Sequence, residues 1–235
     1  LPQLIDDEIA KRLEKNTECD SENEWLKKSM FEYLFTDRLP KLESADGITR
    51  RVTLDKQVRM HPLLGDFISR NFYGSEEQFT SGLPENIFAY DLPHTSGKCA
   101  IWIDVPFEKG RMIKEDKSQI RPAEAEIICD RLQEWIDYDD RRTDDPKKKL
   151  SFGVISFYKA QTELIKRKLG AKFIDSVGEK RLRIGTVDSF QGMEFDVVFL
   201  SLVRTGSKGF GFLRLSNRLN VSMSRQKKLL VTVGD

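Results

Sequence analysis

Three apolar runs near the C-terminal end constrain the fold more than any other feature of the sequence. They span Arg183–Val187, Val197–Val203 and Leu229–Val233, and they are rich in β-branched and aromatic residues, as buried parallel strands are. A polar loop separates the first two runs, and a helical segment with arginine, Leu219–Arg225, precedes the third. This strand, loop, strand, helix, strand order predicts an α/β fold. Packing does not require the loop to be polar, so we expect the loop to carry function.

Size and charge limit what the chain can be. It has 235 residues, of which 39% are hydrophobic and 33% are charged, which suits one good core with an appendage. The formal net charge is +1 and the isoelectric point is about 7.8, so no global basic field marks a nucleic-acid-binding protein. Any surface for nucleic acid must therefore be a local stripe.

Cysteine and histidine usage gives no sign of a metal site or a disulfide framework. Cys19, Cys99 and Cys129 are odd in number and widely spaced, and neither His61 nor His94 has a second histidine nearby. We expect reduced thiols and an intracellular protein of the cytoplasm or nucleus. The first residues, LPQLIDDEIAKRL, do not combine a basic region with an apolar core, and no apolar run is long enough to cross a membrane, so we expect a protein that is not exported and has no membrane partner. The sequence starts without methionine, which suggests a fragment cut from a longer chain.

Three motifs carry a specific spacing. QVRMHP occupies residues 57–62, TVDSFQGME occupies 186–194, and RLNVSMSRQK occupies 218–227. They resemble motifs IV, V and VI of the superfamily 1 helicases, and most of all the Upf-like group of RNA-surveillance helicases and their DNA-replication relatives. The resemblance covers nearly everything from Ser29 to Asp235. It implies a RecA-like parallel sheet flanked by helices, of the type found in the second motor domain of P-loop NTPase helicases.

Half of an ATP site is missing from the sequence. No GxxxxGK[ST] loop occurs, and no strand ends in an acidic pair that could hold magnesium. Residues 1–3 resemble the tail of motif III in a first motor domain. The resemblance thus implies that residues 1–48 are a tail and linker helices and that residues 49–235 form the second motor domain. ATP and Mg²⁺ would be bound mainly by an upstream RecA-like domain, and we expect the isolated chain to hydrolyse no ATP.

The resemblance also assigns residues to the nucleotide. Arg59 and Arg225 would approach the γ-phosphate as catalytic cations, a role that suits a guanidinium because its charge is fixed and its donors form a rigid fork. The other ATP-binding residues would be Gln57, Val58, Gly192 and Glu194.

Three positions near this site leave alternatives open. Val58 stands where the family usually has a tyrosine that stacks on adenine, so adenine affinity and selectivity are in question. Met193 stands where many relatives carry a basic residue. Glu194 either approaches the ribose or the phosphate–metal cluster, or forms an ion pair with Arg218 or Arg225.

Two polar turns resemble the family's contacts to single-stranded DNA or RNA. Ser156, Tyr158 and Lys159 lie where a predicted strand meets a helix N-terminus, whose amides and hydroxyls suit a phosphate. A helix cap would use the same residues and remains the alternative. Thr186 and Ser189 follow the carboxyl end of a predicted strand, where open α/β sheets bind ligands. Contacts to the nucleic-acid backbone do not separate DNA from RNA.

Apolar periodicity and turn residues predict the remaining elements. We expect helices at Asp6–Lys15, Ser21–Phe35, Leu63–Tyr73 and from Pro122; strands at Arg51–Leu54 and Ala100–Val105; an extended segment at Asn86–Asp91 within the irregular stretch Gly74–Arg121; and a solvated charged loop at Tyr138–Lys149.

The sequence therefore predicts the C-terminal motor domain of an ATP-dependent superfamily 1 helicase or translocase. It would supply arginines to an ATP site completed by the upstream domain and would grip single-stranded nucleic acid. The alternative is a non-hydrolysing nucleic-acid-binding or regulatory module derived from a helicase, which Val58 and Met193 motivate.

Overall fold

The computed structural model describes residues 30–75, 77–143, 145, 147–206 and 211–235. The chain divides into two compact units, one up to Leu54 and one from Asp55 to Asp235. The helix predicted at Asp6–Lys15 and the motif III tail at residues 1–3 lie outside the described residues. The functional boundary between residues 48 and 49 stays a prediction.

The described part of the first unit is helical. Its elements are α2 (Met30–Tyr33), the π turn η2 (Leu34–Arg38) and α3 (Leu39–Asp46), so the described end of the second predicted helix is confirmed. The π turn comes shortly before Pro40, whose missing amide N–H interrupts the regular hydrogen-bond ladder. Gly47 ends α3 in the left-handed region at φ 69°.

The strand predicted at Arg51–Leu54 is wrong. These residues have no strand pairing in the structure, and Val52 and Leu54 are exposed. Glu43 fixes Arg51 instead, because its carboxylate accepts hydrogen bonds from the Arg51 amide and guanidinium. A strand is stabilised by its neighbours, so alternating apolar residues without a partner do not form one.

A parallel five-stranded sheet forms the centre of the second unit, which confirms the predicted α/β fold. Its strand order is β3-β9-β8-β6-β7, and every neighbouring pair is parallel. The strands are β3 (Ala100–Asp104), β6 (Phe152–Ser156), β7 (Leu182–Thr186), β8 (Phe195–Ser201) and β9 (Gln226–Gly234). The three apolar runs supply the strands β7, β8 and β9, which lie at the edge, the centre and next to the far edge.

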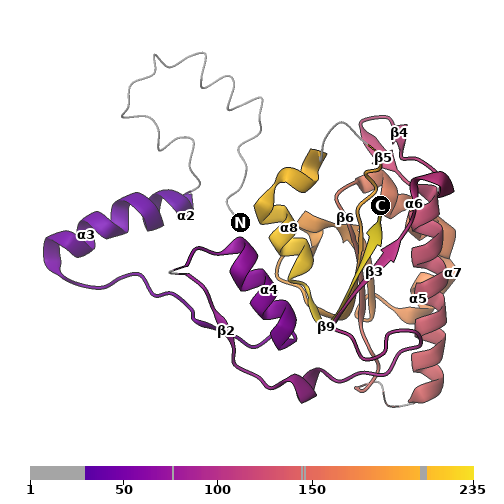
Figure 1. Cartoon of the computed structure of the whole chain (residues 1–235), viewed down its shortest axis with the longest axis horizontal. Coiled ribbons are helices and arrows are strands. Elements are labelled where there is room, and N and C mark those ends of the chain that lie inside the picture. The colour runs from indigo at the N-terminus through magenta and orange to yellow at the C-terminus, as the bar shows by residue number, and fades with distance from the viewer. Residues whose placement is uncertain (1–29, 76, 144, 146, 207–210) are drawn as a thin grey trace. The chain divides into compact units, whose positions relative to one another are not determined.

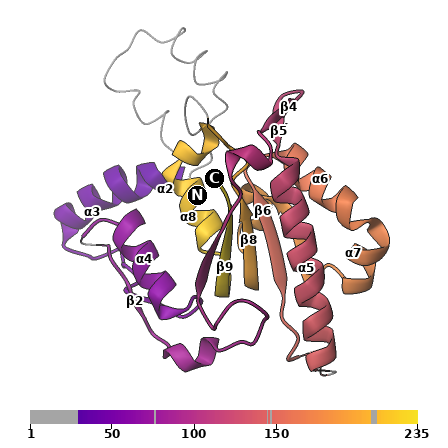
Figure 2. The ribbon, with the colours of Figure 1, turned by 45° about the vertical axis from the view of Figure 1, so that its right-hand side comes forward.

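Helices cover both faces of this sheet (Figures 1 and 2). One face packs against α5 (Pro122–Arg142), α6 (Lys159–Leu169) and α7 (Ala171–Val177), and the other packs against α4 (Pro62–Phe72) and α8 (Ser216–Met223). Residues of β8 alternate between the two cores: Val197 and Phe199 belong to the first, and Val198 and Leu200 to the second. The result is a three-layer sandwich whose central strand is buried on both faces.

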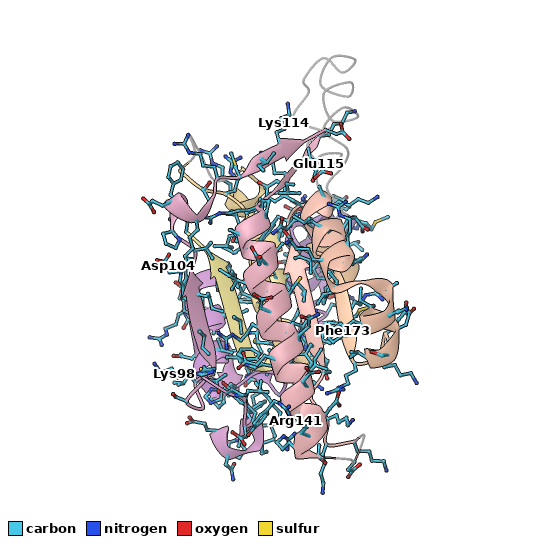
Figure 3. All side chains as sticks on the ribbon, turned by 90° about the vertical axis from the view of Figure 1, so that its right-hand side faces the viewer. Lys98, Asp104, Lys114, Glu115, Arg141 and Phe173 are labelled. Atoms are coloured by element: carbon cyan, nitrogen blue, oxygen red, sulfur yellow. The ribbon has the colours of Figure 1, made fainter. Side chains whose placement is uncertain are left out.

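Helix α5 is longer than predicted, so the loop predicted at Tyr138–Lys149 is wrong in its first part. The helix continues to Arg142 because Asp139 is fully buried and tied to neighbouring elements. Its carboxylate accepts from the Leu150 amide at 2.8 Å and pairs with Arg181 at 2.9 Å. In Figure 3, Arg141 on α5 lies at the same end of the sheet as Lys98, which precedes β3.

The stretch predicted to be irregular contains a β-hairpin. Strands β4 (Ile113–Glu115) and β5 (Ser118–Ile120) pair antiparallel, and Figure 3 shows the hairpin at the same end of the sheet as Asp104. These strands are short and largely polar, so they carry no apolar alternation that could announce them. The segment Asn86–Asp91, predicted to be extended, instead begins inside a 3₁₀ turn, η3 (Glu85–Phe88).

The remaining elements are short. They are β1 (Lys56–Gln57), which pairs with β2 (Thr80–Ser81), and the 3₁₀ turns η4 (Phe107–Lys109), η5 (Val187–Phe190) and η6 (Gly211–Arg214). Among the described helices, none combines the length and the apolar character that crossing a bilayer requires.

Candidate functional site

Three segments that are distant in the sequence meet where β8 and β9 begin, at the amino edge of the sheet. Glu194 directly precedes β8 and Arg225 directly precedes β9, and the amide that follows Glu194 donates to the Arg225 carbonyl at 3.0 Å. The segment that carries Arg59 is attached by the amide of His61, which donates to the Lys227 carbonyl at 2.8 Å. Backbone hydrogen bonds therefore bring two arginines and one glutamate together.

Gln57 holds the turn that presents Arg59. Its Oε1 accepts from the amides of Arg59 and Met60 at 2.9 and 2.7 Å, and its Nε2 donates to the Met60 carbonyl at 2.8 Å and the Ser81 hydroxyl at 2.7 Å. Both donors and both acceptors of this amide are thus used inside the protein. A Cβ at Gly65 would stand 2.7 Å from Nε2, which explains the glycine in α4. In this conformation Gln57 positions the cation and has no donor left for a nucleotide.

Arg59 is accessible, with 36% of its side chain exposed. Its Nε donates to Glu194 Oε2 at 3.1 Å, and its Nη1 donates to the Ser224 carbonyl at 3.4 Å. A guanidinium has five N–H donors in a planar fork, so these bonds leave donors for an anion.

Arg225 is held by the end of α8. Its Nε donates to the Val221 carbonyl at 3.0 Å, its Nη2 to the Ser224 hydroxyl at 3.0 Å, and its Nη1 to the Met193 carbonyl at 3.5 Å. Burial lowers the pKa of the Arg225 guanidinium, and the positive charge of Arg59 nearby lowers it further. Two cations that repel each other in this way gain stability when an anion binds beside them.

Glu194 carries a different cation on each carboxylate oxygen. Arg59 binds Oε2, and Lys227 Nζ lies 2.9 Å from Oε1. The hydrogen bond from Lys227 lowers the pKa of Glu194, and the bond from Arg59 adds to this effect while burial opposes it. The carboxylate is therefore the negative centre of a site with three nearby cations.

The ion-pair alternative for Glu194 is right in kind but wrong in its partners. Arg218 pairs with Asp188 at 3.2 Å, and the cations that bind Glu194 are Arg59 and Lys227. Sequence reasoning missed Lys227. The signal was the strand itself, since residues at the start of β9 must face the residue that precedes β8.

Val58 and Gly192 lie beside these charged groups in the sequence and serve different needs. Val58 is 65% exposed, so it offers apolar surface without a π-face. Gly192 has φ 79°, and a Cβ built there would meet nothing within 4 Å. The loop therefore needs glycine at this position for its backbone conformation, not for space.

Ser156 and Tyr158 lie at the carboxyl edge, where β6 ends, and both are buried. The Ser156 hydroxyl donates to the Ser201 carbonyl at 3.2 Å and accepts from the Tyr158 amide at 3.3 Å. Ser156 therefore has no exposed group for a direct contact with nucleic acid in this structure. The alternative of a structural role at the start of the helix agrees better with this geometry, because the Ser156 hydroxyl fixes the turn that leads into α6.

Lys159 begins α6 and is exposed. With Tyr158 it lines a cavity of about 520 Å³ between α6 and the β4–β5 hairpin, which Arg167 and Glu163 also line. The Ala160 amide donates to the Ser118 hydroxyl at 3.2 Å and so ties the hairpin to the helix N-terminus. The charges around the cavity are mixed, so Lys159 is not part of a broad basic surface.

Thr186 and Ser189 form a tight turn after β7. The Ser189 hydroxyl donates to the Thr186 carbonyl at 2.7 Å, and a Cβ at Gly185 would collide with Ser189 Oγ in this rotamer, so glycine at 185 leaves room for that hydrogen bond. The Ser189 proton is used, whereas the Thr186 hydroxyl makes no hydrogen bond to any described residue. The Thr186 hydroxyl is therefore the donor of this turn that no described residue uses.

A buried ion pair at the carboxyl edge was not singled out from the sequence. Arg121 Nη1 lies 3.2 Å from Glu124 Oε1, and neither side chain is exposed. Glu124 also accepts from the Ser201 hydroxyl at 2.6 Å and from the Val203 amide at 3.0 Å. Val203 is β-branched yet has φ 69°, a strained conformation that the Glu124 bond holds. Burial raises the pKa of Glu124 despite these bonds.

Comparison with known proteins identifies the family. A family model described as an AAA domain matches residues 26–235. An uncharacterized ATP-dependent helicase of Methanocaldococcus jannaschii is 30% identical over 225 residues, which are 92% of this chain and 30% of that protein. The chain belongs to the superfamily 1 helicases. The resemblance drawn from motifs IV, V and VI is thereby confirmed.

Two further helicases are consistent with the Upf-like group. Helicase sen1 of Schizosaccharomyces pombe is 29% identical over 187 residues, 77% of this chain and 10% of that protein. The DNA polymerase alpha-associated DNA helicase A of Saccharomyces cerevisiae is 45% identical over 86 residues, 36% of this chain and 12% of that protein. This superfamily 1 chain spans less than a third of the length of each of these three relatives.

Among solved structures, the C-terminal domain of a possible DNA helicase from Lactobacillus plantarum gives a TM-score of 0.42 at 14% identity. The match covers 76% of this chain and 87% of that chain. A likeness this distant adds nothing to the assignment of the superfamily 1 chain, which the sequence relatives establish.

Proposed function

We propose that this chain is the second motor domain of an ATP-dependent helicase and supplies Arg59 and Arg225 to ATP held mainly by an upstream RecA-like domain. One observation carries the proposal. Two guanidiniums from distant segments converge at an exposed edge, where three cations (Arg59, Arg225 and Lys227) face one carboxylate, that of Glu194. This excess of two positive charges suits the γ-phosphate of a nucleotide.

Arg59 is the cation that can change partner. Its ion pair with Glu194 is partly exposed, and such pairs are worth about 0–1 kcal/mol, so exchanging the carboxylate for a phosphate oxygen costs little. Arg225 is anchored more firmly through Val221 and the Ser224 hydroxyl, and its Nη1 bond to Met193 is long enough to be given up easily. As the bond to the γ-phosphate breaks, the two guanidiniums balance the charge that spreads over the phosphoryl oxygens.

The segment between Thr186 and Glu194 supplies a physical link between the two edges of the sheet. Thr186 ends β7 at the carboxyl edge, while Glu194 precedes β8 at the amino edge. Because the two strands are parallel, the segment must run the length of the sheet, and Val187 and Phe190 bury it in the core beneath α8. A shift at the nucleotide end can therefore move the Thr186 turn.

We place the grip on single-stranded DNA or RNA at this carboxyl edge. Lys159 supplies a positive charge, and Thr186 supplies a hydroxyl donor, while Ser189, Tyr158 and the buried Ser156 shape the turns. All of these groups suit the phosphate backbone and none reads a base edge. Closure of the nucleotide cleft would tighten this grip, and hydrolysis would release it.

The missing half of the site belongs to an upstream domain in this proposal. Among the described residues, no group of three or more His, Cys, Asp or Glu side chains is placed to hold a metal ion. We assign Mg²⁺ to the upstream domain, which would also hold the β- and γ-phosphates. The isolated chain is then inactive, and the complete protein acts inside the cell.

The test is strand-stimulated ATP turnover by a protein that carries this chain together with its upstream domain. We expect single-stranded DNA or RNA to stimulate the wild type, and Arg225→Ala to reduce turnover by about a thousandfold. Arg131→Ala is the matched control, since this arginine pairs with Glu134 on α5, far from the nucleotide edge. Unchanged turnover in Arg225→Ala would refute the proposal, and so would turnover by the isolated chain.

A non-hydrolysing regulatory module is the second candidate, because Val58 offers adenine no π-surface and Met193 replaces a residue that is often basic. It takes over if the wild type binds both kinds of strand and hydrolyses ATP with neither. The two convergent arginines favour the motor, since a module without hydrolysis has no need for them.

A further inference from the structure

Lys227 is attached to both halves of the proposed nucleotide site through different atoms. Its carbonyl accepts the His61 amide at 2.8 Å, the bond that fixes the segment with Arg59. Its ammonium lies 2.9 Å from Glu194 Oε1. One residue of β9 thus fixes the positions of Arg59 and Glu194 relative to each other.

The neighbouring lysine has a different environment. Lys228 Nζ donates to the Ala89 carbonyl at 2.9 Å, away from Glu194. The two lysines carry equal charge, belong to the same strand and are both partly buried. Only Lys227 contacts Glu194, so Lys228 is a matched control for it.

The negative charge of the Glu194 carboxylate opposes the binding of a phosphate nearby. In this structure, Arg59 and Lys227 each neutralise one oxygen of the carboxylate. If Arg59 moves to a phosphate oxygen, Oε2 loses its partner and a negative charge faces the incoming anion. Like charges a few ångströms apart in a partly desolvated site repel strongly enough to weaken binding. Lys227 is the cation that stays with Glu194.

We propose that Lys227 is a positioning residue of the nucleotide site, which retains and neutralises Glu194 so that Arg59 can exchange this carboxylate for a phosphate. This inference rests on the proposed function. It assigns Lys227 no contact with the nucleotide. The Lys227 carbonyl anchors the Arg59 segment in any side-chain variant, so substitutions of Lys227 test the ammonium alone.

The experiment measures the affinity of the protein with its upstream domain for a fluorescent ATP analogue that resists hydrolysis. Lys227→Met is expected to raise Kd by about tenfold, the loss of one charged hydrogen bond. Lys227→Arg restores most of the affinity because it keeps the charge, and Lys228→Met leaves Kd within about twofold of wild type.

A second background separates positioning from direct contact. With Glu194→Gln already present, adding Lys227→Met is expected to change Kd by less than about twofold, because no carboxylate remains to be neutralised. An equal loss in both backgrounds overturns the inference, since Lys227 then acts on the phosphate or on the fold. The absence of any loss in Lys227→Met alone also overturns it.

Failure of the proposed function looks different. If the wild type does not bind the analogue, or if Arg225→Ala binds and hydrolyses ATP as well as the wild type, the proposed nucleotide site is wrong and the role of Lys227 is wrong with it. If the wild type binds and Arg225→Ala loses turnover while Lys227→Met matches the wild type, only the role of Lys227 is wrong.

Discussion

The two edges of the central sheet hold their charges in opposite ways. At the amino edge, Arg59 and Glu194 are 36% and 45% exposed and share their bonds with Lys227 and a backbone carbonyl. At the carboxyl edge, Arg121 and Glu124 are fully buried and bonded to groups of the protein. An exposed pair is worth about 0–1 kcal/mol, whereas breaking a buried pair costs about 3–5 kcal/mol. The first edge can exchange partners with a ligand, and the second is built to stay fixed.

This difference gives each edge a role in the proposed motor. The buried pair holds the strained Val203 and so fixes the chain where it leaves β8. Because the chain is held rigidly where it leaves β8, a movement of Glu194 at the amino edge can displace the Thr186 turn relative to the rest of the carboxyl edge. We therefore expect substitutions at the amino edge to change turnover with little effect on stability, and substitutions of the buried network to do the reverse.

The largest effect is expected from Arg59→Ala. Removing a cation that meets the γ-phosphate lowers strand-stimulated turnover by about a thousandfold, and the urea midpoint of the chain stays near that of wild type because Arg59 is partly exposed. Arg70→Ala, in α4, removes an exposed arginine paired with Asp66 and serves as the control. A loss of stability as large as the loss of turnover would contradict the proposed separation of the two edges.

The next effect is expected from Glu124→Ala. It leaves the Arg121 guanidinium buried without its carboxylate and frees the strained Val203, so the free energy of unfolding falls by about 3–5 kcal/mol. Urea denaturation of the 235-residue chain measures this, with Glu126→Ala on the exposed side of α5 as the control. Equal stability in the two variants would show that the buried pair does not fix this edge.

Within the carboxyl edge, Ser156→Ala and Lys159→Ala are expected to separate packing from binding. Ser156→Ala removes a buried hydrogen bond and lowers the free energy of unfolding by about 1 kcal/mol without a matching change in the salt dependence of strand binding.

Lys159→Ala lowers the affinity for single strands several-fold and reduces the slope of log affinity against log salt concentration by about one ion. Fluorescence titrations at several salt concentrations measure both. An unchanged slope in Lys159→Ala would remove Lys159 from the interface.

The smallest effect concerns pH. The Lys227 hydrogen bond lowers the pKa of Glu194 below its usual 4.5, so the ionised carboxylate stabilises the folded chain above that value. This contribution is lost as the pH falls through the lower, folded-state pKa. Between about pH 5 and pH 3, the urea midpoint of wild type should therefore fall slightly more than that of Glu194→Gln. Parallel curves for the two proteins would show that the pair contributes nothing in solution.

Much of the sheet could be predicted because its strands carry their own signal. The runs that became β8 and β9 are buried on both faces and almost wholly apolar, which few other structures require, and the β7 run carries its apolar residues on one face. The length of α5 and the missing strand at Arg51–Leu54 could not be predicted in the same way. Asp139 extends the helix through contacts with Leu150 and Arg181, which are distant in space until the chain has folded. Helix propensity depends on the local sequence and cannot reveal partners that are distant along the chain.

The residues of the site also divide into those that the sequence motifs identify and those whose environment depends on contacts formed only in the folded chain. The motifs led to Arg59, Arg225 and Glu194, which the structure brings together, because charged residues at fixed spacing are informative in the sequence. The burial of Ser156 could not be predicted, because a hydroxyl in a turn has the same sequence pattern whether it is buried or exposed. Glu124 escaped notice because an acidic residue in the first turn of a helix already has an ordinary explanation in the helix dipole.

The most direct measurement is a structure of the protein with its upstream domain, ADP, aluminium fluoride and a single strand. We expect the guanidiniums of Arg59 and Arg225 both to lie within hydrogen-bond distance of the fluoride, with Arg59 released from Glu194 and Lys227 still bound to that carboxylate. A structure in which, with the fluoride in place, Arg59 remains on Glu194 and Arg225 Nη1 remains on the Met193 carbonyl would contradict the proposed site.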